Sequence, residues 1–439
     1  KREALGYAQK ASMGALIRSA NAEAIAQATQ ALGWLDIIEA PRERAEVEVG
    51  LNVPLTAALM SSQGWMAPRL KATVDRSYEL LGLVGDHPHV AAAIWVLALY
   101  YTLGGHDREK VRGLLARLRG MASQAGDLGL ESASLSLLGY LDKLDGRLAD
   151  ARACVDRILE VYDPVAHRGQ CYLYGQDSKA GGCSAIAPAL WYEGYPEKAL
   201  AHSKVGMAWA QELNHATSIA LSIYYHFHLL YELEDRDGVL RLVDTVQKLA
   251  DRHGLVEQVV NVNIFRGWAR QDPEEFEKNL NTRSAAGNVL DLSLFSCILA
   301  ELEAASGRQE AALARLERSL EVAQQQAEAC YIPMILRRKG LLLLERDPGA
   351  HEAAEACFRR AIELSRAQGA KMHELQATTA LSQLLLARGR HEEAGNSLAT
   401  LYDWFTEGFD TPPLREARGV LDALKRASPE RARREGGEA

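Results

Sequence analysis

The stretch Gly389–Ala394, which reads Gly-Arg-His-Glu-Glu-Ala, decides the fold because its spacing recurs along the chain. A glycine is followed five residues later by an alanine, and a large apolar residue such as Leu398 comes four positions after that. Glycine adopts the backbone conformation that ends one helix, and a small alanine lets the next helix approach its partner closely. The spacing therefore predicts a helical hairpin. The same pair occurs at Gly146 and Ala151, Gly194 and Ala199, Gly307 and Ala312, and Gly349 and Ala354.

These hairpin signals share one period. Looser copies begin near Gly105, Asp235 and Gln271, and the copies from Gly105 to Gly389 repeat every 41 residues or so, against about 34 in a typical tetratricopeptide repeat (TPR). A single hairpin cannot bury its apolar face alone, so hairpins stack into a solenoid. We predict an all-α fold, a TPR-like right-handed superhelix of about ten helical hairpins. A helical bundle with chance spacings is disfavoured, because a bundle has no reason to keep one period.

The repeat also predicts how the chain is divided. Residues 1–104 are expected to form degenerate N-terminal hairpins and residues 105–410 the TPR-like array. Two prolines at 412 and 413 open a helix over 411–427 that is expected to cap the array. The polar segment 428–439 is expected to be a disordered tail.

Composition excludes several classes of protein. The 439 residues are 48% apolar and carry 50 Lys and Arg against 58 Asp and Glu, which argues against nucleic-acid binding. The longest apolar run, 90–101, is shorter than the ~18 residues that span a bilayer, and the opening Lys1–Glu3 does not resemble a secretory leader. A start other than Met suggests a piece of a longer protein. The six scattered cysteines contain no Cys-x-x-Cys pair, so we expect a reducing, cytoplasmic location.

Motifs of catalysis and metal binding are not found in the sequence. There is no P-loop and no Gly-x-Ser-x-Gly, and the lone pair His167 and Cys171 lacks a second pair that would complete a metal site. We therefore expect no enzyme activity in this chain, no metal and no cofactor. The basic run Arg337-Arg338-Lys339 is either a solvated helix face or a contact for an acidic partner.

One segment is unusual in its composition. Residues 162–231 contain eleven of the aromatic residues and five of the 12 histidines. Aromatic side chains with polar tips favour interfaces, and first helices of stacked hairpins line a concave binding surface. Bulky packing between long helices is the alternative, and Asp177 also suits a helix cap. The candidate residues for binding a partner or ligand are Tyr172, Tyr174, Asp177, Trp191, Tyr195, Tyr225 and His226.

Several short segments scattered along the sequence resemble those of a known family. They are Arg18–Ile25 (Arg-Ser-Ala-Asn-Ala-Glu-Ala-Ile), Tyr162-Asp163-Pro164 with His167-Arg168, Tyr174–Asp177 (Tyr-Gly-Gln-Asp), Leu190-Trp191 with Gly194-Tyr195-Pro196 and Ala199-Leu200, Ala356–Ala361 (Ala-Cys-Phe-Arg-Arg-Ala), and Trp404–Asp410 (Trp-Phe-Thr-Glu-Gly-Phe-Asp). The chain resembles the C-terminal TPR-like region of bacterial signalling proteins that carry a class III adenylate or guanylate cyclase domain and an AAA/STAND-type ATPase. It departs from the family at Ser178, where a proline is expected, and at Gly181-Gly182 and Pro188, which interrupt an expected helix.

The resemblance implies a role in signal transduction. The chain would be a non-catalytic sensor that binds a protein, a peptide or a small effector and regulates an ATPase and cyclase N-terminal to it. Three alternatives stay open: a structural scaffold for homo-oligomers, an enzyme with an unrecognised site in the aromatic segment, and the effector-binding region of a STAND-type transcription regulator. The last would need a DNA-binding domain that this chain lacks.

Overall fold

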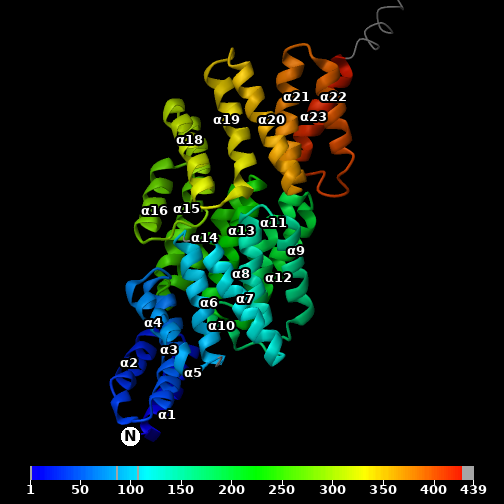
Figure 1. Ribbon diagram of the computed structural model, residues 1–439. Helices are drawn as coiled ribbons and strands as arrows, with labels where there is room; N and C mark the ends of the chain where they lie inside the picture. Colours follow the sequence, from blue (N-terminus) through cyan, green and yellow to red (C-terminus); the bar gives the residue numbers. More distant parts are fainter. Residues whose placement is uncertain (1, 86–87, 106–107, 428–439) are drawn as a thin grey trace, which may run out of the picture.

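The computed structural model describes residues 2–85, 88–105 and 108–427. The regular secondary structure in these residues is helical, and antiparallel helices follow one another from the N-terminal to the C-terminal end of an elongated molecule (Figure 1). Consecutive helices form hairpins, and neighbouring hairpins stack. The predicted fold class, an all-α TPR-like solenoid, is confirmed.

The N-terminal hairpins precede the regular part of the array. Proline occupies the first position of several of these helices, where its missing N–H costs nothing. The helices are α1 (Arg2–Ile17), α2 (Asn21–Leu32), the 3-10 turn η1 (Leu35–Ile37), α3 (Pro41–Gln63), α4 (Pro68–Glu79), the short α5 (Leu81–Val84), α6 (Pro88–Leu103) and α7 (Arg108–Ala125).

The central and C-terminal hairpins continue the same arrangement. After the hairpin α8 (Leu128–Leu144) and α9 (Leu148–Val161) comes the short α10 (Gln170–Tyr174), and a 3-10 turn, η2 (Ala329–Tyr331), precedes α19. The later pairs are α11 (Ser178–Glu193) with α12 (Pro196–Leu213), α13 (Ala216–Glu232) with α14 (Arg236–His253), α15 (Val256–Ala269) with α16 (Pro273–Ala285), α17 (Leu292–Ala305) with α18 (Gln309–Gln325), α19 (Ile332–Arg346) with α20 (His351–Gln368), and α21 (Lys371–Ala387) with α22 (His391–Tyr402).

The last helix, α23 (Pro412–Ala427), packs against α21 and α22. The predicted tail, 428–439, lies outside the described residues. The domain boundaries near residues 105 and 411 stay predictions, since one connected apolar core runs through the stacked hairpins.

The Gly-x4-Ala pairs mark hairpin turns. Each glycine lies between the two helices, and each alanine is at most 1% exposed in the first turns of the second helix. Four of the glycines have the positive φ that favours glycine, with 76° at Gly146 and 100° at Gly194. Gly349 differs, because its φ is not in this region and its turn is closed by an N–H···O bond of 2.8 Å to Asp347.

The segment that departs from the family pattern is one continuous helix, so the expected interruption at Gly181-Gly182 and Pro188 is wrong. Both glycines and the proline lie within α11, whose residues from Ala180 to Glu193 are all buried. A Cβ at Gly182 would lie 2.7 Å from Cδ1 of Ile158 in α9. The glycine is therefore what lets these two helices pack closely.

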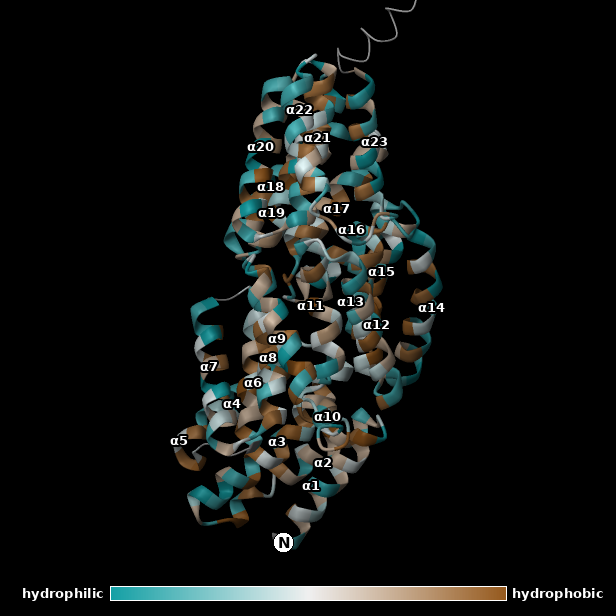
Figure 2. Ribbon diagram, turned by 90° about the vertical axis from the view of Figure 1, so that its right-hand side faces the viewer, coloured by the Kyte–Doolittle hydropathy of each residue, from teal (hydrophilic) through white to brown (hydrophobic). Residues whose placement is uncertain are grey.

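First and second helices of the hairpins have different surroundings. Nearly every residue of the first helix α13 is buried, whereas its partner α14 buries a single stripe that includes Val239, Val243 and Val246. Figure 2 shows α14 at the edge of the molecule with much of its surface hydrophilic. First helices contact first helices of the next hairpin, so they form the interior of the solenoid.

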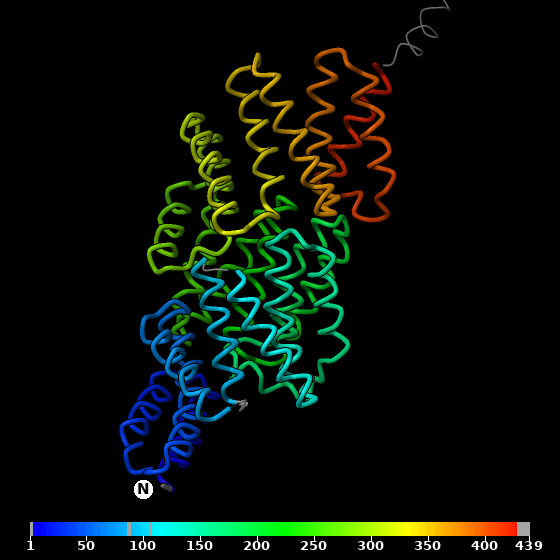
Figure 3. Tube along the Cα trace, in the orientation of Figure 1, coloured from blue at the N-terminus to red at the C-terminus, as the bar shows by residue number. Residues whose placement is uncertain are grey.

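The superhelix winds so that two successive turns touch. In the tube of Figure 3, residues 290–410 lie above residues 100–195. The two segments are in contact, since α11 packs against α21 and α8 packs against η2. We call this contact the seam. Hairpin-turn glycines lie on it: a Cβ at Gly146 would lie 2.9 Å from Gln368, and one at Gly194 2.7 Å from Trp404. No helix among residues 2–85, 88–105 and 108–427 combines the length and apolarity that crossing a membrane requires.

Candidate functional site

Asp177, a predicted binding residue, caps α11. Its Oδ1 accepts a hydrogen bond of 2.9 Å from the backbone N–H of Ala180, and its Oδ2 accepts one of 2.5 Å from the hydroxyl of Tyr162. The indole of Trp209 donates a third, of 3.1 Å, to Oδ1. Asp177 is 0% exposed, and burial raises its pKa. The predicted helix cap is confirmed, and each carboxylate oxygen is engaged within the protein.

The predicted aromatic residues are mostly part of the interior. Trp191 is fully buried in α11, and Tyr174 is buried with its ring centroid 5.4 Å from that of Trp95. Tyr172 is half-buried, and its ring meets the edge of His215 at 5.4 Å. These contacts are those of helix packing, the alternative that the sequence left open.

The remaining predicted residues lie apart from one another. Tyr195 is half-buried at the seam, with its ring 5.7 Å from that of Trp404, and Tyr225 packs 5.7 Å from the ring of Tyr140. His226 is buried with its Nδ1 2.9 Å from the hydroxyl of Ser203, and burial lowers its pKa to about 4. The structure therefore distributes the predicted residues over several places in the interior, and their role in binding stays a prediction.

A buried polar network that sequence analysis missed crosses the seam. We call it the Asp291 network: Tyr140 and Lys143 of α8, Asp291 before α17, and Tyr331 of η2. Asp291 accepts hydrogen bonds of 2.5 Å from the Tyr140 hydroxyl and 2.7 Å from the Tyr331 hydroxyl. Lys143, 0% exposed, donates to the Tyr331 oxygen at 3.3 Å and lies 4.1 Å from the centre of the Tyr140 ring.

Charge is balanced in the Asp291 network. Burial opposes ionisation of Asp291, but the charge of Lys143 and the two hydroxyl donors hold its pKa below the ordinary value. Asp291 has a φ of 57°, a left-handed conformation that aspartate and asparagine tolerate better than most residues. The network is a structural element that joins the two superhelical turns.

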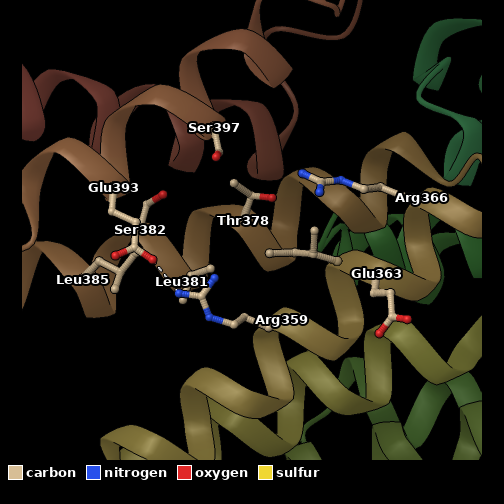
Figure 4. A pocket seen from close by; sticks show the side chains of 10 residues that line it. Arg359, Glu363, Arg366, Thr378, Leu381, Ser382, Leu385, Glu393 and Ser397 are labelled. Carbon is tan, nitrogen blue, oxygen red and sulfur yellow. Dashed lines mark hydrogen bonds and ion pairs between the residues drawn. The ribbon is translucent and has the colours of Figure 1, made fainter.

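An open groove lies between α20 and α22, with α21 as its floor (Figure 4). We call it the α21 groove. Its volume is about 340 Å³, within the range of ligand pockets. Figure 4 shows Arg359 and Glu393 together at one end, Arg366 at the other, and Ser397 across from Thr378. The lining residues are Arg359, Ile362, Glu363, Arg366, Thr378, Leu381, Ser382, Leu385, Glu393 and Ser397.

The chemistry of the α21 groove is mixed. Leu381 and Leu385 give it an apolar floor, and its charged residues are already paired, as in the hydrogen bond of 2.6 Å from Arg366 to Glu374. The buried hydroxyl of Thr378 has no hydrogen-bond partner among the residues that the structure describes. An apolar floor, a free hydroxyl and a rim with both signs of charge suit an extended peptide better than a small charged molecule.

A second hollow, of about 410 Å³, lies where α3 and α4 meet α15 and α16. Met66, Pro68, Val256 and Val260 give it a largely apolar lining. Its polar member Glu257 is satisfied, because its carboxylate accepts hydrogen bonds of 2.7 Å from the Trp65 backbone N–H and from the Asn288 amide.

Metal-ligand clusters and thiols are the reactive groups that can be assessed in the described residues. In residues 2–85, 88–105 and 108–427, no three His, Cys, Asp or Glu side chains come close enough to hold a metal ion. Burial raises the pKa of Cys154, Cys171 and Cys183 to about 12, so these thiols stay protonated at neutral pH. A protonated thiol is a weak nucleophile.

The basic run Arg337-Arg338-Lys339 is not a solvated helix face. Arg337 is 8% exposed and Arg338 and Lys339 are half-buried. Arg338 forms an ion pair with Glu301 of α17, and Lys339 forms one of 3.0 Å with Glu317. The solvated-face interpretation is therefore wrong for Arg337, because α19 is a first helix and turns this residue toward the interior.

Comparison with known proteins places the chain in no described family. No protein-family model matches it. An uncharacterized protein of Rhizobium meliloti (strain 1021) is 22% identical over 296 residues, which are 66% of this chain but only 29% of that protein. The chain thus spans less than a third of the length of this relative.

Three solved structures are similar in helical arrangement. The Rap protein complexed with competence and sporulation factor has a TM-score of 0.42 at 12% identity, covering 98% of this chain and 100% of that one. Yeast Tom70 has a TM-score of 0.39 at 12% identity, with 99% and 97% covered. The Cut9–Hcn1 hetero-tetramer of APC/C has a TM-score of 0.34 at 13% identity, with 96% of both chains covered.

Proposed function

We propose that this chain is a non-catalytic interaction module that binds a segment of a protein or a peptide in the α21 groove. The observation that carries the proposal is the groove itself: stacked hairpins leave an open channel with the apolar floor of Leu381 and Leu385 and a free hydroxyl at Thr378. A channel between parallel helices accommodates an extended segment, whose side chains reach the floor while its backbone meets the polar rim.

The finer part of the proposal is regulation. Occupation of the groove would change the activity of an ATPase and nucleotidyl-cyclase region in the same protein. Support comes from the sequence words that resemble such signalling proteins, and from a Rhizobium meliloti relative in which the matched part is less than a third of the length. Regulation requires that the partner bind one state of the whole protein more tightly than another.

The test begins with peptides selected from a display library on the purified chain, whose affinities are then measured by calorimetry. Ser397→Trp fills the α21 groove from the exposed rim of α22, and Asn396→Trp places the same side chain next to it, outside the groove. We expect Ser397→Trp to abolish binding and Asn396→Trp to leave it unchanged. Peptides that bind the Ser397→Trp variant with wild-type affinity would overturn the groove as the site.

Two further measurements complete this test. Val256→Trp fills the second hollow from an exposed position, so a loss of binding in this variant alone would move the site to that hollow. In the full-length protein, a selected peptide should change ATP turnover or cyclic-nucleotide production in the wild type and not in the Ser397→Trp variant. Equal turnover with and without peptide would refute the regulatory part and leave the interaction part standing.

A further inference from the structure

Arg337 is a buried cation without a partner. It is 8% exposed on α19, and it forms no hydrogen bond or ion pair with any residue that the structure describes. The neighbouring Arg338 uses the nearby carboxylate, Glu301, for its own ion pair. Burial and the charge of Arg338 lower the pKa of Arg337 to about 10, so its guanidinium is charged at neutral pH.

Two groups beside Arg337 also hold buried polar atoms without a hydrogen-bond partner among the described residues, although the Trp191 indole lies close enough to the Glu232 carboxyl group to favour its ionised form. Glu232 at the end of α13 is 9% exposed and its Oε1 has no partner, and His373 of α21 is 2% exposed with both ring nitrogens unpaired. Arg337 lies close enough for its charge to oppose the burial that raises the pKa of Glu232, and to add to the burial that lowers the pKa of His373. We call these three residues the Arg337 cluster.

Glu232 does not supply the missing counter-charge reliably. Burial raises its pKa to about 7, so near neutral pH a large part of it is protonated. Burial lowers the pKa of His373 to about 3, so its ring is neutral and offers one N–H donor. The cluster therefore combines neutral donors with the charge of Arg337, which forms no ion pair among the described residues and feels the charges of Glu301 and Glu416 only from beyond ion-pair distance.

Such an arrangement is expensive unless something completes it. Native proteins pair buried charges and satisfy buried polar atoms with protein groups, water or a ligand. The groups come from α13, α19 and α21, which are first helices and face the interior of the solenoid. Arg337 and Glu232 each retain a small exposed fraction, so neither residue is completely closed off from solvent.

We propose that the Arg337 cluster binds a carboxylate, supplied either by a small organic acid or by an acidic peptide. A carboxylate presents two oxygens in the plane of the guanidinium fork, which is the geometry that arginine recognises best. It also brings a single negative charge, which balances the single unpaired cation; a phosphate dianion would bring one charge too many. The N–H of His373 and the protonated form of Glu232 supply the further donors. This site is separate from the α21 groove, and Ser397→Trp leaves it intact.

The test measures the thermal unfolding temperature of the chain with millimolar acetate, propionate, the acetylated tripeptide amide Ala-Glu-Ala, acetylated tri-alanine with a free C-terminus, or inorganic phosphate. We expect at least one carboxylate probe to raise this temperature in a saturable way. The two small acids represent one source of the carboxylate. The Glu-containing amide and the free C-terminus represent the other.

Three variants decide the role of Arg337. Arg337→Met keeps an unbranched apolar stem and removes the charge, so we expect about 100-fold weaker carboxylate binding, with a ligand-free unfolding temperature at or above that of the wild type. Arg337→Lys keeps the charge without the planar fork and should bind about 10-fold more weakly than the wild type. Arg360→Met, at an exposed position of α20 paired with Glu363, is the matched control and should behave as the wild type.

Several outcomes would overturn the proposal. They are stabilisation by phosphate alone, the absence of any carboxylate effect, and an equal effect in the wild type and in Arg337→Met. A ligand-free Arg337→Met chain that unfolds several degrees lower would overturn it as well, because Arg337 would then have a structural partner.

Discussion

The Asp291 network and the Arg337 cluster are both buried, and both bring together residues from distant parts of the chain. They differ in how their charges are matched. In the network, Asp291 accepts two hydroxyl hydrogen bonds and lies near the charge of Lys143, so each charge has a partner. In the cluster, the charge of Arg337 faces a carboxyl group of raised pKa and a neutral imidazole.

This difference separates a structural element from a binding element. A balanced buried network rigidifies the fold, and removing one member leaves another uncompensated. An unbalanced cluster is destabilising in the absence of a ligand, so removing its charge should be tolerated. The same kind of substitution should therefore have opposite effects in the two regions, and the following predictions test this contrast.

The largest effect is expected for Asp291→Asn. Asparagine has nearly the same shape and tolerates the left-handed backbone at φ 57°, so the change removes the charge and replaces one of the two oxygens that accept a hydroxyl hydrogen bond by an amide donor. Lys143, 0% exposed, would then be buried without a counter-charge, and we expect the free energy of unfolding to fall by about 4 kcal/mol. Urea unfolding followed by circular dichroism measures this change. Asp150→Asn at an exposed position of α9 is the control. If Asp291→Asn lowered the free energy of unfolding by less than about 1 kcal/mol, the Asp291 network would not be the structural element that the comparison requires.

The next prediction concerns coupling. Because Lys143 and Asp291 compensate each other, the double variant Lys143→Met with Asp291→Asn should lose about 3 kcal/mol less than the sum of the two single losses. The same cycle with Arg337→Met and Glu232→Gln should give a coupling below about 1 kcal/mol, because these side chains share no hydrogen bond. Equal coupling energies in the two cycles would contradict the contrast.

The third prediction is a pH dependence at Glu232. Burial raises its pKa in the folded protein from 4.5 to about 7, so the folded chain keeps a proton that the unfolded chain releases. The contribution of Glu232 to stability is then present below pH 4.5 and is lost as the pH rises toward 7. Glu232→Gln resembles the protonated form, so the variant should match the wild type at pH 4.5 and be more stable by roughly 2 kcal/mol at pH 8.

Several charged groups around Glu232 enter this prediction. Arg337 and Arg338 of α19 favour the ionised form, as does the indole of Trp191 in α11, and Glu301 of α17 opposes it. A Glu232→Gln chain that is less stable than the wild type at pH 8 would mean that Glu232 is ionised and paired with Arg337. The cluster would then be as balanced as the network.

Local spacing was enough to predict the hairpins. Gly146 ends one helix, and Ala151, five residues later, lets the next helix pack closely against it. Neither effect depends on distant parts of the chain. The cap at Asp177 was predictable for the same reason. The Asp291 network was not, because Tyr140 meets Asp291 only after the superhelix has completed a turn of some 150 residues.

The Arg337 cluster could have been found in part. Arg337 stands three residues from Met334 and three from Gly340, both buried, so the periodicity of α19 places it on the apolar side of the helix. The sequence analysis weighed the three basic residues of the run together and missed this difference among them. That Glu232 and His373 lie beside Arg337 depends on the stacking of three hairpins, which spacing along one helix does not determine.

The smallest effects on the free energy of unfolding are expected when phenylalanine replaces a polar aromatic side chain at two buried positions. Tyr331→Phe removes one hydroxyl donor from Asp291 and should lower the free energy of unfolding by about 1 to 2 kcal/mol. His373→Phe removes two unpaired nitrogens from a ring that packs 4.5 Å from Tyr192, and should be neutral or stabilising by up to about 1 kcal/mol. Urea unfolding of both variants measures the pair under one condition. Both changes leave an apolar ring in a buried site, so the two losses in free energy of unfolding can be compared directly. A loss in His373→Phe as large as that in Tyr331→Phe would show that the imidazole has a hydrogen-bond partner in solution. The Arg337 cluster would then be a satisfied network.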